Sequence, residues 1–258
     1  METSYRDIRD QLNNGRRVLF IGTSCQVWGL KCFLGKTYEN LLTVDLICHG
    51  VPPETYLREY LAYQEKRLGK KIDAVTFRGD TKENDFHIWL WSKGIPLYGR
   101  FAREDLFFAG FVNFMIFEEK CYSCPFASAY RVADLSIGDW GGPTNLKGQK
   151  LSLVFVNTAA AQNWVEELRN ESDSEWEPHT VEQAVQSNEQ LQGPSTKPKE
   201  YEQMREAYRE SGYISMAQQY IAPYIRRYRQ KKRREKQRWV IGLPLRALRK
   251  IKRKVFNS

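Results

Sequence analysis

The sequence predicts an α/β protein with a mixed, partly parallel sheet flanked by helices and a helical, basic C-terminal extension. Apolar runs of strand length alternate with segments of helical composition in the first fifty residues. Glycine and proline stand where these segments begin and end. Lys and Arg are concentrated near the C-terminus, which predicts the basic extension.

One strand–helix–strand–helix unit is predicted near the N-terminus. A short polar helix over Tyr5–Leu12 precedes it, and Arg17–Ile21 has the apolar composition of a buried parallel strand. A helix then ends at Gly35, Asn40–Ile47 forms the second strand, and Pro52 opens the next helix. This order makes the two strands parallel and joins them by a right-handed crossover.

The middle of the chain predicts further strands and two helices. The strands are Ile72–Arg78, Phe86–Ser92, Val132–Ile137 and Leu151–Asn157, and the helices are Arg103–Phe117 and Ala159–Arg169. In the first of these helices, Phe107, Phe111 and Phe114 recur at helical spacing. We interpret them as a stripe that faces the core rather than as a cofactor site.

Charge divides the chain into a mildly acidic body and a strongly basic tail. The stretch from Arg226 to Lys254 contains fifteen Lys and Arg residues and one acidic residue, so its net charge is +14. The whole chain carries +9, which leaves −5 for the remainder. The body therefore has no excess of positive charge for nucleic acid. We predict a sheet-bearing domain over residues 1–199, a helical extension over 200–238 and a basic amphipathic tail over 239–258.

The expected location is cytoplasmic. No apolar run approaches the roughly 20 residues of a membrane span, and the first residues lack the apolar core of a signal peptide. Thiols stay reduced in the cytoplasm, so paired cysteines there indicate a metal or redox site rather than a structural disulfide.

The five cysteines carry the main chemical signal. Cys121 and Cys124 form a Cys-x-x-Cys pair, while Cys25 and Cys48 each follow the end of a predicted parallel strand. Parallel strands end at one edge of a sheet, where such sheets bind ligands, so these thiols can reach one place. Four thiolates bind either zinc or an iron–sulfur cluster. Zinc sites usually combine two short cysteine pairs, and the single pair here favours a cluster.

The remaining cysteine and the histidines carry weaker signals. Cys32 lies seven residues after Cys25 on the same helical face, so it could compete for a ligand role, but we expect it to pack against the sheet. His49 either tunes a metal site by hydrogen bonding or is an ordinary loop residue, and the sequence leaves this open. His87 and His179 belong to no motif and are expected to be ordinary surface or strand residues.

Four motifs carry a resemblance to a known family, and they are Gly22–Gln26, Leu46–Pro52, Cys121–Cys124 and Ile137–Trp140. From about Tyr5 to about Lys199 the chain resembles the C-terminal domain of the coenzyme F420 hydrogenase/dehydrogenase beta subunit family. Members are iron–sulfur flavoproteins that pass electrons between a cluster, a flavin and a diffusible acceptor. Bacterial relatives often belong to gene sets for polysaccharide synthesis.

By position, the resemblance implies that Cys25, Cys48, Cys121 and Cys124 are the ligands of one [4Fe–4S] cluster. It also implies that Gly22, Thr23, Gly138 and Asp139 line the cofactor region. Full-length relatives begin with a ferredoxin-type module and carry a Ser-Ser-Gly-Gly segment that contributes to flavin binding. Neither has a counterpart before Tyr5, so FAD binding is left open, and we expect a redox partner protein or a subunit that supplies the missing N-terminal part.

The basic tail has three interpretations: a solvated run of charge, a nucleic-acid arm without a recognisable module, or an interfacial segment. Apolar residues from Trp239 to Phe256 beside many cations favour the third. We therefore hypothesise peripheral contact with the anionic inner face of the membrane.

The sequence as a whole predicts an iron–sulfur oxidoreductase or electron-transfer subunit that relays electrons through one [4Fe–4S] cluster. The alternative is a non-catalytic, membrane-associated accessory protein of polysaccharide biosynthesis with a structural metal site. No catalytic acid or base is identified.

Overall fold

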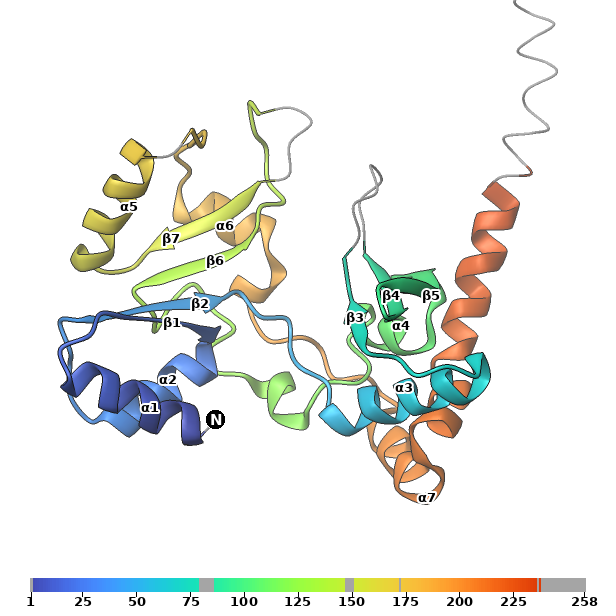
Figure 1. The fold of residues 1–258 in the computed structure, drawn as a ribbon. Coiled ribbons are helices and arrows are strands. Elements are labelled where there is room, and N and C mark those ends of the chain that lie inside the picture. Colours follow the sequence, from blue (N-terminus) through green and yellow to red (C-terminus); the bar gives the residue numbers. More distant parts are fainter. Residues whose placement is uncertain (1, 79–85, 147–150, 172, 236, 238–258) are drawn as a thin grey trace, which may run out of the picture. The chain divides into compact units, whose positions relative to one another are not determined.

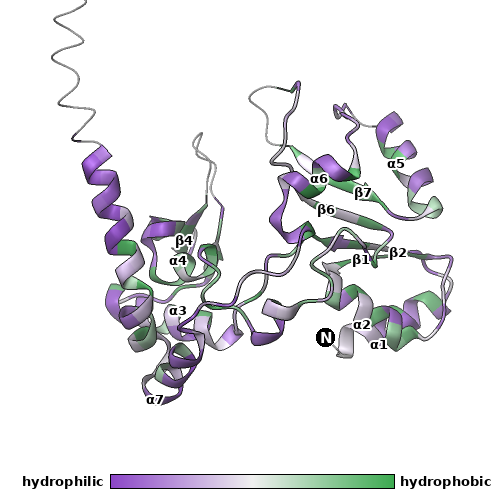
Figure 2. Ribbon diagram, turned by 180° about the vertical axis from the view of Figure 1, so that it is seen from behind, coloured by the Kyte–Doolittle hydropathy of each residue, from purple (hydrophilic) through white to green (hydrophobic). Residues whose placement is uncertain are grey.

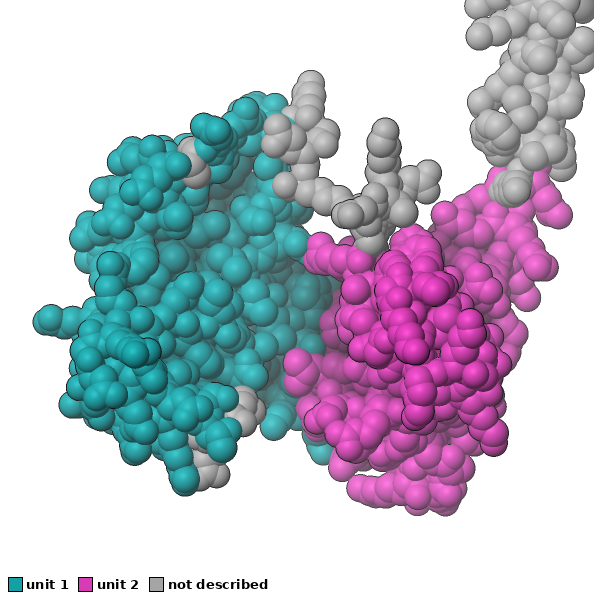
Figure 3. All heavy atoms as spheres, viewed as in Figure 1, with its two compact units in different colours: residues 1–50, 119–196 teal, residues 51–118, 197–258 magenta. Residues whose placement is uncertain are grey.

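A computed structural model of the chain describes residues 2–78, 86–146, 151–171, 173–235 and 237. The chain forms two compact units, each built from two separate stretches of sequence (Figure 3). Unit 1 comprises Met1–Gly50 and Glu119–Thr196, and unit 2 comprises Val51–Glu118 and Lys197–Ser258. The chain passes between the units three times, and the boundary expected near residue 199 lies close to the last passage, after Thr196; the sequence does not reveal that 51–118 belong to another unit.

Unit 1 contains a mixed, four-stranded sheet in the order β1-β2-β6-β7 (Figure 1). Its strands are β1 (Val18–Thr23), β2 (Leu41–Leu46), β6 (Leu135–Asp139) and β7 (Ser152–Val156). The first three are parallel, and β7 runs antiparallel to β6. The predicted fold class is therefore confirmed, and so are the parallel pairing of the first two strands and the helix between them.

Helices cover both faces of this sheet (Figure 1). They are α1 (Glu2–Asn13), α2 (Ser24–Leu34), α5 (Ala159–Glu171) and α6 (Val181–Ser187). Ala161 and Val165 of α5 pack on Leu42, Val44 and Leu135 of the sheet. On the face where α5 packs, this cover does not extend over the edge strand β1: Leu19 and Ile21, the register partners of Leu42 and Val44, are 55% and 56% exposed. The prediction that this strand is buried was wrong for these two side chains, because they point to a face of β1 that is open to solvent.

Unit 2 is built on a three-stranded antiparallel sheet of β3 (Ala74–Thr76), β4 (His87–Ser92) and β5 (Ile95–Phe101). Its helices are α3 (Glu54–Leu68), α4 (Leu106–Val112) and α7 (Tyr201–Tyr220). Strand β5 was not predicted. Lys93 and Gly94, with φ of 50° and 75°, form the tight turn before it, and a turn with two positive φ angles is typical of a β-hairpin.

The predicted helix over Arg103–Phe117 is much shorter in the structure. A 3-10 turn η1 (Ala102–Glu104) leads to Asp105, which caps the seven-residue α4. Phe114, beyond the end of α4, has a φ of 57°, which lies outside the range of a right-handed helix. Phe107 is buried in the core as expected. Helix α6 and the 3-10 turns η2 (Glu119–Ser123) and η3 (Glu189–Leu191) were not predicted.

The predicted C-terminal extension is helical in its described part. Helix α7 has a kink at Gly212 (φ 76°, ψ 176°), and residues 222–235 continue as a helix that Figure 2 shows to be largely hydrophilic. The tail over 239–258 lies outside the described residues. Among the described helices, none is both long and apolar enough to cross a membrane.

A buried carboxylate organises the core of unit 2. One oxygen of Asp105, Oδ1, accepts from the backbone N–H groups of Phe107 and Phe108 at 2.9 and 2.8 Å, which caps α4. The other, Oδ2, accepts from the hydroxyl groups of Tyr60 and, at 3.0 Å, Tyr98. Asp105 is fully buried. The charge is therefore held by four hydrogen bonds instead of by water.

Unit 2 should lose stability in alkali. Burial raises the pKa of Tyr56 to about 12, and burial together with the Asp105 carboxylate raises the pKa of Tyr60 and Tyr98 above the ordinary value. The folded state keeps protons that the unfolded chain releases near its tyrosine pKa of about 10. The stabilisation is therefore complete below that pH and is lost as the pH rises further.

Urea unfolding followed by circular dichroism on both sides of about pH 10 tests this pH dependence. We expect a constant midpoint below that pH and a falling midpoint above it. Tyr60→Phe should reduce the slope. Tyrosinate absorbance that develops fully near the ordinary tyrosine pKa while the chain stays folded would contradict the prediction.

Candidate functional site

Four of the five cysteines approach one another in unit 1. Cys25 lies in the first turn of α2, and Cys48 follows the end of β2 by two residues. Thr23 and Leu46, the last residues of β1 and β2, are register partners, so both cysteines leave the sheet at the same edge. Cys121 lies in the 3-10 turn η2, and Cys124 directly follows it.

The electrostatic environment of Cys48 includes the thiols of the other three cysteines. Burial raises the pKa of the Cys48 thiol, while a hydrogen bond from the backbone of Gly50 acts in the opposite direction. The charges of Cys121, Cys25 and Cys124 raise that pKa further. Cysteines from three separate segments therefore lie within electrostatic range of Cys48.

Polar groups surround Cys25 as well. Its Sγ lies 3.1 Å from the hydroxyl of Thr23, and the Tyr5 hydroxyl donates to the backbone oxygen of Gln26 at 2.8 Å. Burial, and then the charge of Cys25, raise the pKa of Tyr5. The N-terminus of α2 also contributes a partial positive charge, which favours anionic groups beside it.

In the described part of the chain, no three Cys, His, Asp or Glu side chains are placed to hold a metal ion. The lack of such a group among the described residues does not conflict with the thiols that lie near Cys48. Ligands of a single zinc ion lie about 2.3 Å from it and hence close to each other, whereas a four-iron cluster keeps its ligands farther apart. Cys32 is exposed, so the prediction that it packs against the sheet was wrong.

Two of the predicted cofactor-region residues have local packing roles. A Cβ on Gly22 would lie 2.9 Å from Oε1 of Gln26, and that oxygen accepts from the backbone N–H of Thr23 at 2.8 Å. A Cβ on Gly138 would lie 2.9 Å from Cδ1 of Ile47. Both glycines thus allow close approach of segments that lead into Cys25 and Cys48.

His49 and Asp139 lie near each other at the same edge. Burial lowers the pKa of His49, and the charges of Asp139 and Glu189 oppose this. The backbone oxygen of His49 accepts from the Ser195 hydroxyl at 2.9 Å. Asp139 is exposed at the end of β6, so it is accessible at the edge where Cys48 lies.

A guanidinium group lies behind the cysteine segments. The Arg131 side chain is 2% exposed, and its Nη2 lies 2.9 Å from Oδ2 of the fully buried Asp45. The same nitrogen donates to the hydroxyl of Ser24 at 2.6 Å. Neither Arg131 nor Asp45 belongs to a motif, and sequence reasoning missed both because their contact spans 86 positions of the chain.

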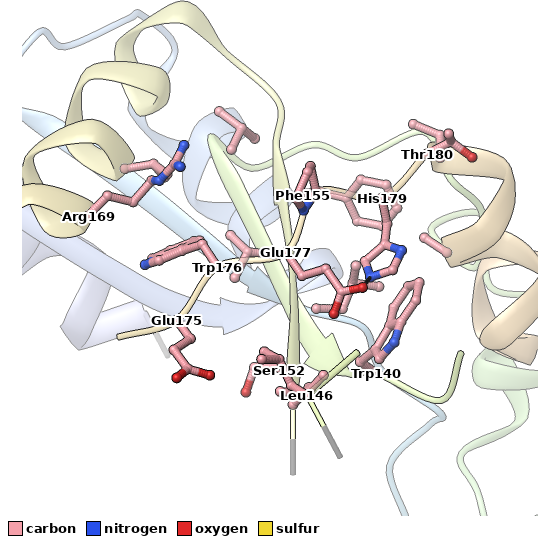
Figure 4. Close-up of a pocket in the computed structure, with 18 of the residues that line it drawn as sticks. Trp140, Leu146, Ser152, Phe155, Arg169, Glu175, Trp176, Glu177, His179 and Thr180 are labelled. Atoms are coloured by element: carbon pink, nitrogen blue, oxygen red, sulfur yellow. Dashed lines mark ion pairs between the residues drawn. The ribbon is translucent and has the colours of Figure 1, made fainter. Parts of the chain in front are cut away.

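A separate pocket of about 490 Å³ lies along β7 (Figure 4). On one side Trp140 stacks on His179, with ring centroids 4.2 Å apart and planes inclined by 28°. Nearby, Glu177 accepts from the Thr144 hydroxyl at 2.7 Å and lies 3.6 Å from Nε2 of His179. The hydrogen bond from Thr144 is the main cause of the lowered pKa of Glu177. The expectation that His179 is an ordinary surface or strand residue missed this environment.

Comparison with known families identifies one match. The matching family is the C terminus of the beta subunit of coenzyme F420 hydrogenase/dehydrogenase, and the match covers residues 15–182. The matched region contains all four converging cysteines as well as Arg131 and Asp45. No curated protein matches the chain.

Proposed function

The chain belongs to the family of C-terminal domains of the coenzyme F420 hydrogenase/dehydrogenase beta subunit, and on this basis we propose that it is an iron–sulfur electron-transfer domain. The proposed ligands of one [4Fe–4S] cluster are Cys25, Cys48, Cys121 and Cys124. A redox role is what the family implies. The cluster and its ligands are the more specific part of the proposal.

The observation that supports this proposal is that the thiols of Cys121, Cys25 and Cys124 all act on the pKa of Cys48, although these residues come from three separate segments. Four thiolates are the usual ligand set of a [4Fe–4S] cluster, which accepts and releases single electrons when bound. The edge of the sheet where β1 and β2 end supplies further support, since the backbone N–H of Gly50 and the N-terminus of α2 favour negative charge there.

We also propose that Gly22, Thr23, Gly138 and Asp139 border a flavin at this edge of the sheet. A flavin would connect one-electron transfer with hydride transfer. A domain from the C terminus of a beta subunit is compatible with a partner subunit. We propose that such a redox partner supplies or removes the electrons.

Anaerobic purification of the full chain tests the cluster directly. We expect broad visible absorbance, about four irons per chain as one [4Fe–4S] cluster requires, and an electron paramagnetic resonance signal after reduction. A flavin would be visible in the same spectrum. A colourless protein with stoichiometric zinc would contradict the proposal and support the accessory protein with a structural metal.

Replacing single cysteines identifies the ligands. Cys121→Ser should reduce the iron content severalfold or abolish it, because serine replaces a thiolate by a hydroxyl that is a poor ligand for iron–sulfur clusters. Cys32→Ser is the matched control, since Cys32 is exposed on the same helix as Cys25 and should retain full iron. Equal iron content in the two variants would contradict the proposed ligand set.

We further propose that the basic C-terminal segment contacts anionic membranes. In its described part, seven exposed cations lie within nine residues: Arg226, Arg227, Arg229, Lys231, Lys232, Arg233 and Arg234. Each basic residue near an anionic surface contributes about 1 kcal/mol. A chain truncated after Gln230 should therefore bind vesicles containing phosphatidylserine at least tenfold more weakly than the full chain. Equal partition of the two would contradict the proposal.

A further inference from the structure

The buried pair of Arg131 and Asp45 is placed to do more than neutralise itself. The side chain of Asp45 is 0% exposed and that of Arg131 is 2% exposed. Neither carboxylate oxygen of Asp45 has a well-aligned hydrogen-bond donor among the described residues, so its compensation is the charge of Arg131. Buried ion pairs are costly to desolvate, and apolar residues of similar volume often stabilise a fold better.

The nitrogens of Arg131 reach the three segments that carry the cysteines. Nη2 donates to the Ser24 hydroxyl, next to Cys25, and to the backbone oxygen of Leu46 at 3.3 Å, two residues before Cys48. Nη1 donates to the backbone oxygen of Phe126 at 3.0 Å, two residues after Cys124.

Two more hydrogen bonds complete the set. Nη1 also donates to the backbone oxygen of Ser128 at 3.3 Å, and Nε donates to the hydroxyl of Ser136 on β6 at 3.1 Å. A guanidinium group has five N–H donors in a rigid plane, whereas a lysine ammonium is a single point with three. Only arginine can therefore join all these segments at once.

From this arrangement we infer that Arg131 is a positioning residue that holds the cysteine segments together, and that its pairing with Asp45 sets the charge beside the cluster. The claim about charge rests on the proposed cluster. The claim about positioning concerns the thiols alone and can be tested without a cluster.

The electrostatic role of the pair predicts the direction in which the midpoint potential shifts, which a role in packing alone would not predict. A cluster gains negative charge on reduction, so a positive charge nearby favours the reduced state and a negative charge disfavours it. Asp45→Asn leaves Arg131 uncompensated and should raise the midpoint potential. Arg131→Gln leaves Asp45 uncompensated and should lower it. Both substitutions break the same ion pair, yet they should shift the potential in opposite directions.

The test uses the full chain, purified and reconstituted anaerobically. Iron retention against a chelator and the midpoint potential are measured for the wild type, Asp45→Asn, Arg131→Gln and Arg131→Lys. We expect Arg131→Gln to weaken iron retention by about 10–100-fold, as is typical for groups that orient metal ligands. Arg131→Lys keeps the charge, so its potential should remain near that of the wild type while its retention falls. The control is Arg17→Gln, which removes an exposed cation at the start of β1, at the other end of the strand from Cys25.

Equal retention in all variants, or shifts of one sign for Asp45→Asn and Arg131→Gln, would overturn the inference while leaving the cluster in place. A wild-type chain without iron would instead overturn the proposed function. The geometric part is then decided on the metal-free chain with a short bifunctional thiol reagent and mass spectrometry. Cross-links between Cys25, Cys48 and the Cys121–Cys124 pair should form in the wild type and decrease severalfold in Arg131→Gln. Equal cross-link yields would refute positioning.

Discussion

Replacing Asp105 by alanine should lower the free energy of unfolding by about 3–5 kcal/mol, the range observed when one partner of a buried charged network is removed. The substitution deletes the acceptor of four hydrogen bonds at once. The hydroxyls of Tyr60 and Tyr98 would lose their acceptor on Asp105, and α4 would lose its cap. Each unmade buried hydrogen bond costs about 1–3 kcal/mol.

Urea unfolding of the alanine variant measures this loss of stability. Two milder variants separate the contribution of the helix cap from that of the tyrosine hydrogen bonds. Asp105→Ser keeps a side-chain oxygen for capping but does not reach the tyrosines, so it should lie between alanine and the wild type. Tyr98→Phe removes one donor and should cost about 1 kcal/mol. A loss below about 1 kcal/mol for Asp105→Ala would show that the network does not stabilise unit 2.

Replacing Arg131 by methionine should have a comparable effect in unit 1, again about 3–5 kcal/mol. The substitution leaves the carboxylate of Asp45 buried without its counter-charge. The double variant Arg131→Met, Asp45→Leu should recover much of the loss, because it removes both charges and leaves apolar side chains in their place. A double-mutant cycle on the metal-free chain measures the coupling.

An exposed ion pair provides the control for this cycle. On α3, Nη2 of Arg58 lies 2.6 Å from Oε1 of Glu54, and the two side chains are 76% and 81% exposed. Arg58→Met should change the free energy of unfolding by no more than about 0.5 kcal/mol, since pairs of this kind are screened by water. Similar losses at Arg58 and Arg131 would show that burial does not govern the strength of the Arg131 pair.

The two readouts for Arg131 separate stability from function. A loss of stability alone would describe an ordinary buried ion pair. Opposite shifts in potential for Asp45→Asn and Arg131→Gln, together with loss of iron or of cross-linking, require the pair to act on the cysteines. The geometry favours the second outcome, because Arg131 donates to Ser24, Leu46 and Phe126, which lie one or two positions from Cys25, Cys48 and Cys124 in the chain.

Local sequence signals predicted most of unit 1. The apolar run before Gly22 and the run before Cys48 are strands, and Gly35 with a φ of 66° ends the helix between them. The parallel order of these strands placed Cys25 and Cys48 at one edge, and the structure brings the Cys121–Cys124 pair to them. These features could be predicted because a strand or helix end depends on a few neighbouring residues.

The same signals failed where neighbours in space decide the outcome. An apolar composition could not tell that Leu19 and Ile21 lie at a sheet edge, or that Cys32 is exposed. The phenylalanines after Arg103 had helical spacing, yet Asp105 delays the helix and the turn at Phe114 ends it early. The strand after Lys93 was missed although its turn residues are typical of a hairpin.

Local patterns in the sequence thus sufficed for the α/β class, for the strands β1 and β2, and for the cysteines whose thiols lie near Cys48. The ion pair of Arg131 and Asp45, in contrast, could be found only in the folded structure. Asp45 is one acid within a strand, and Arg131 stands among loop residues 86 positions later. Their pairing exists because folding removes both from water, and a buried charge must then find its partner wherever the fold places it.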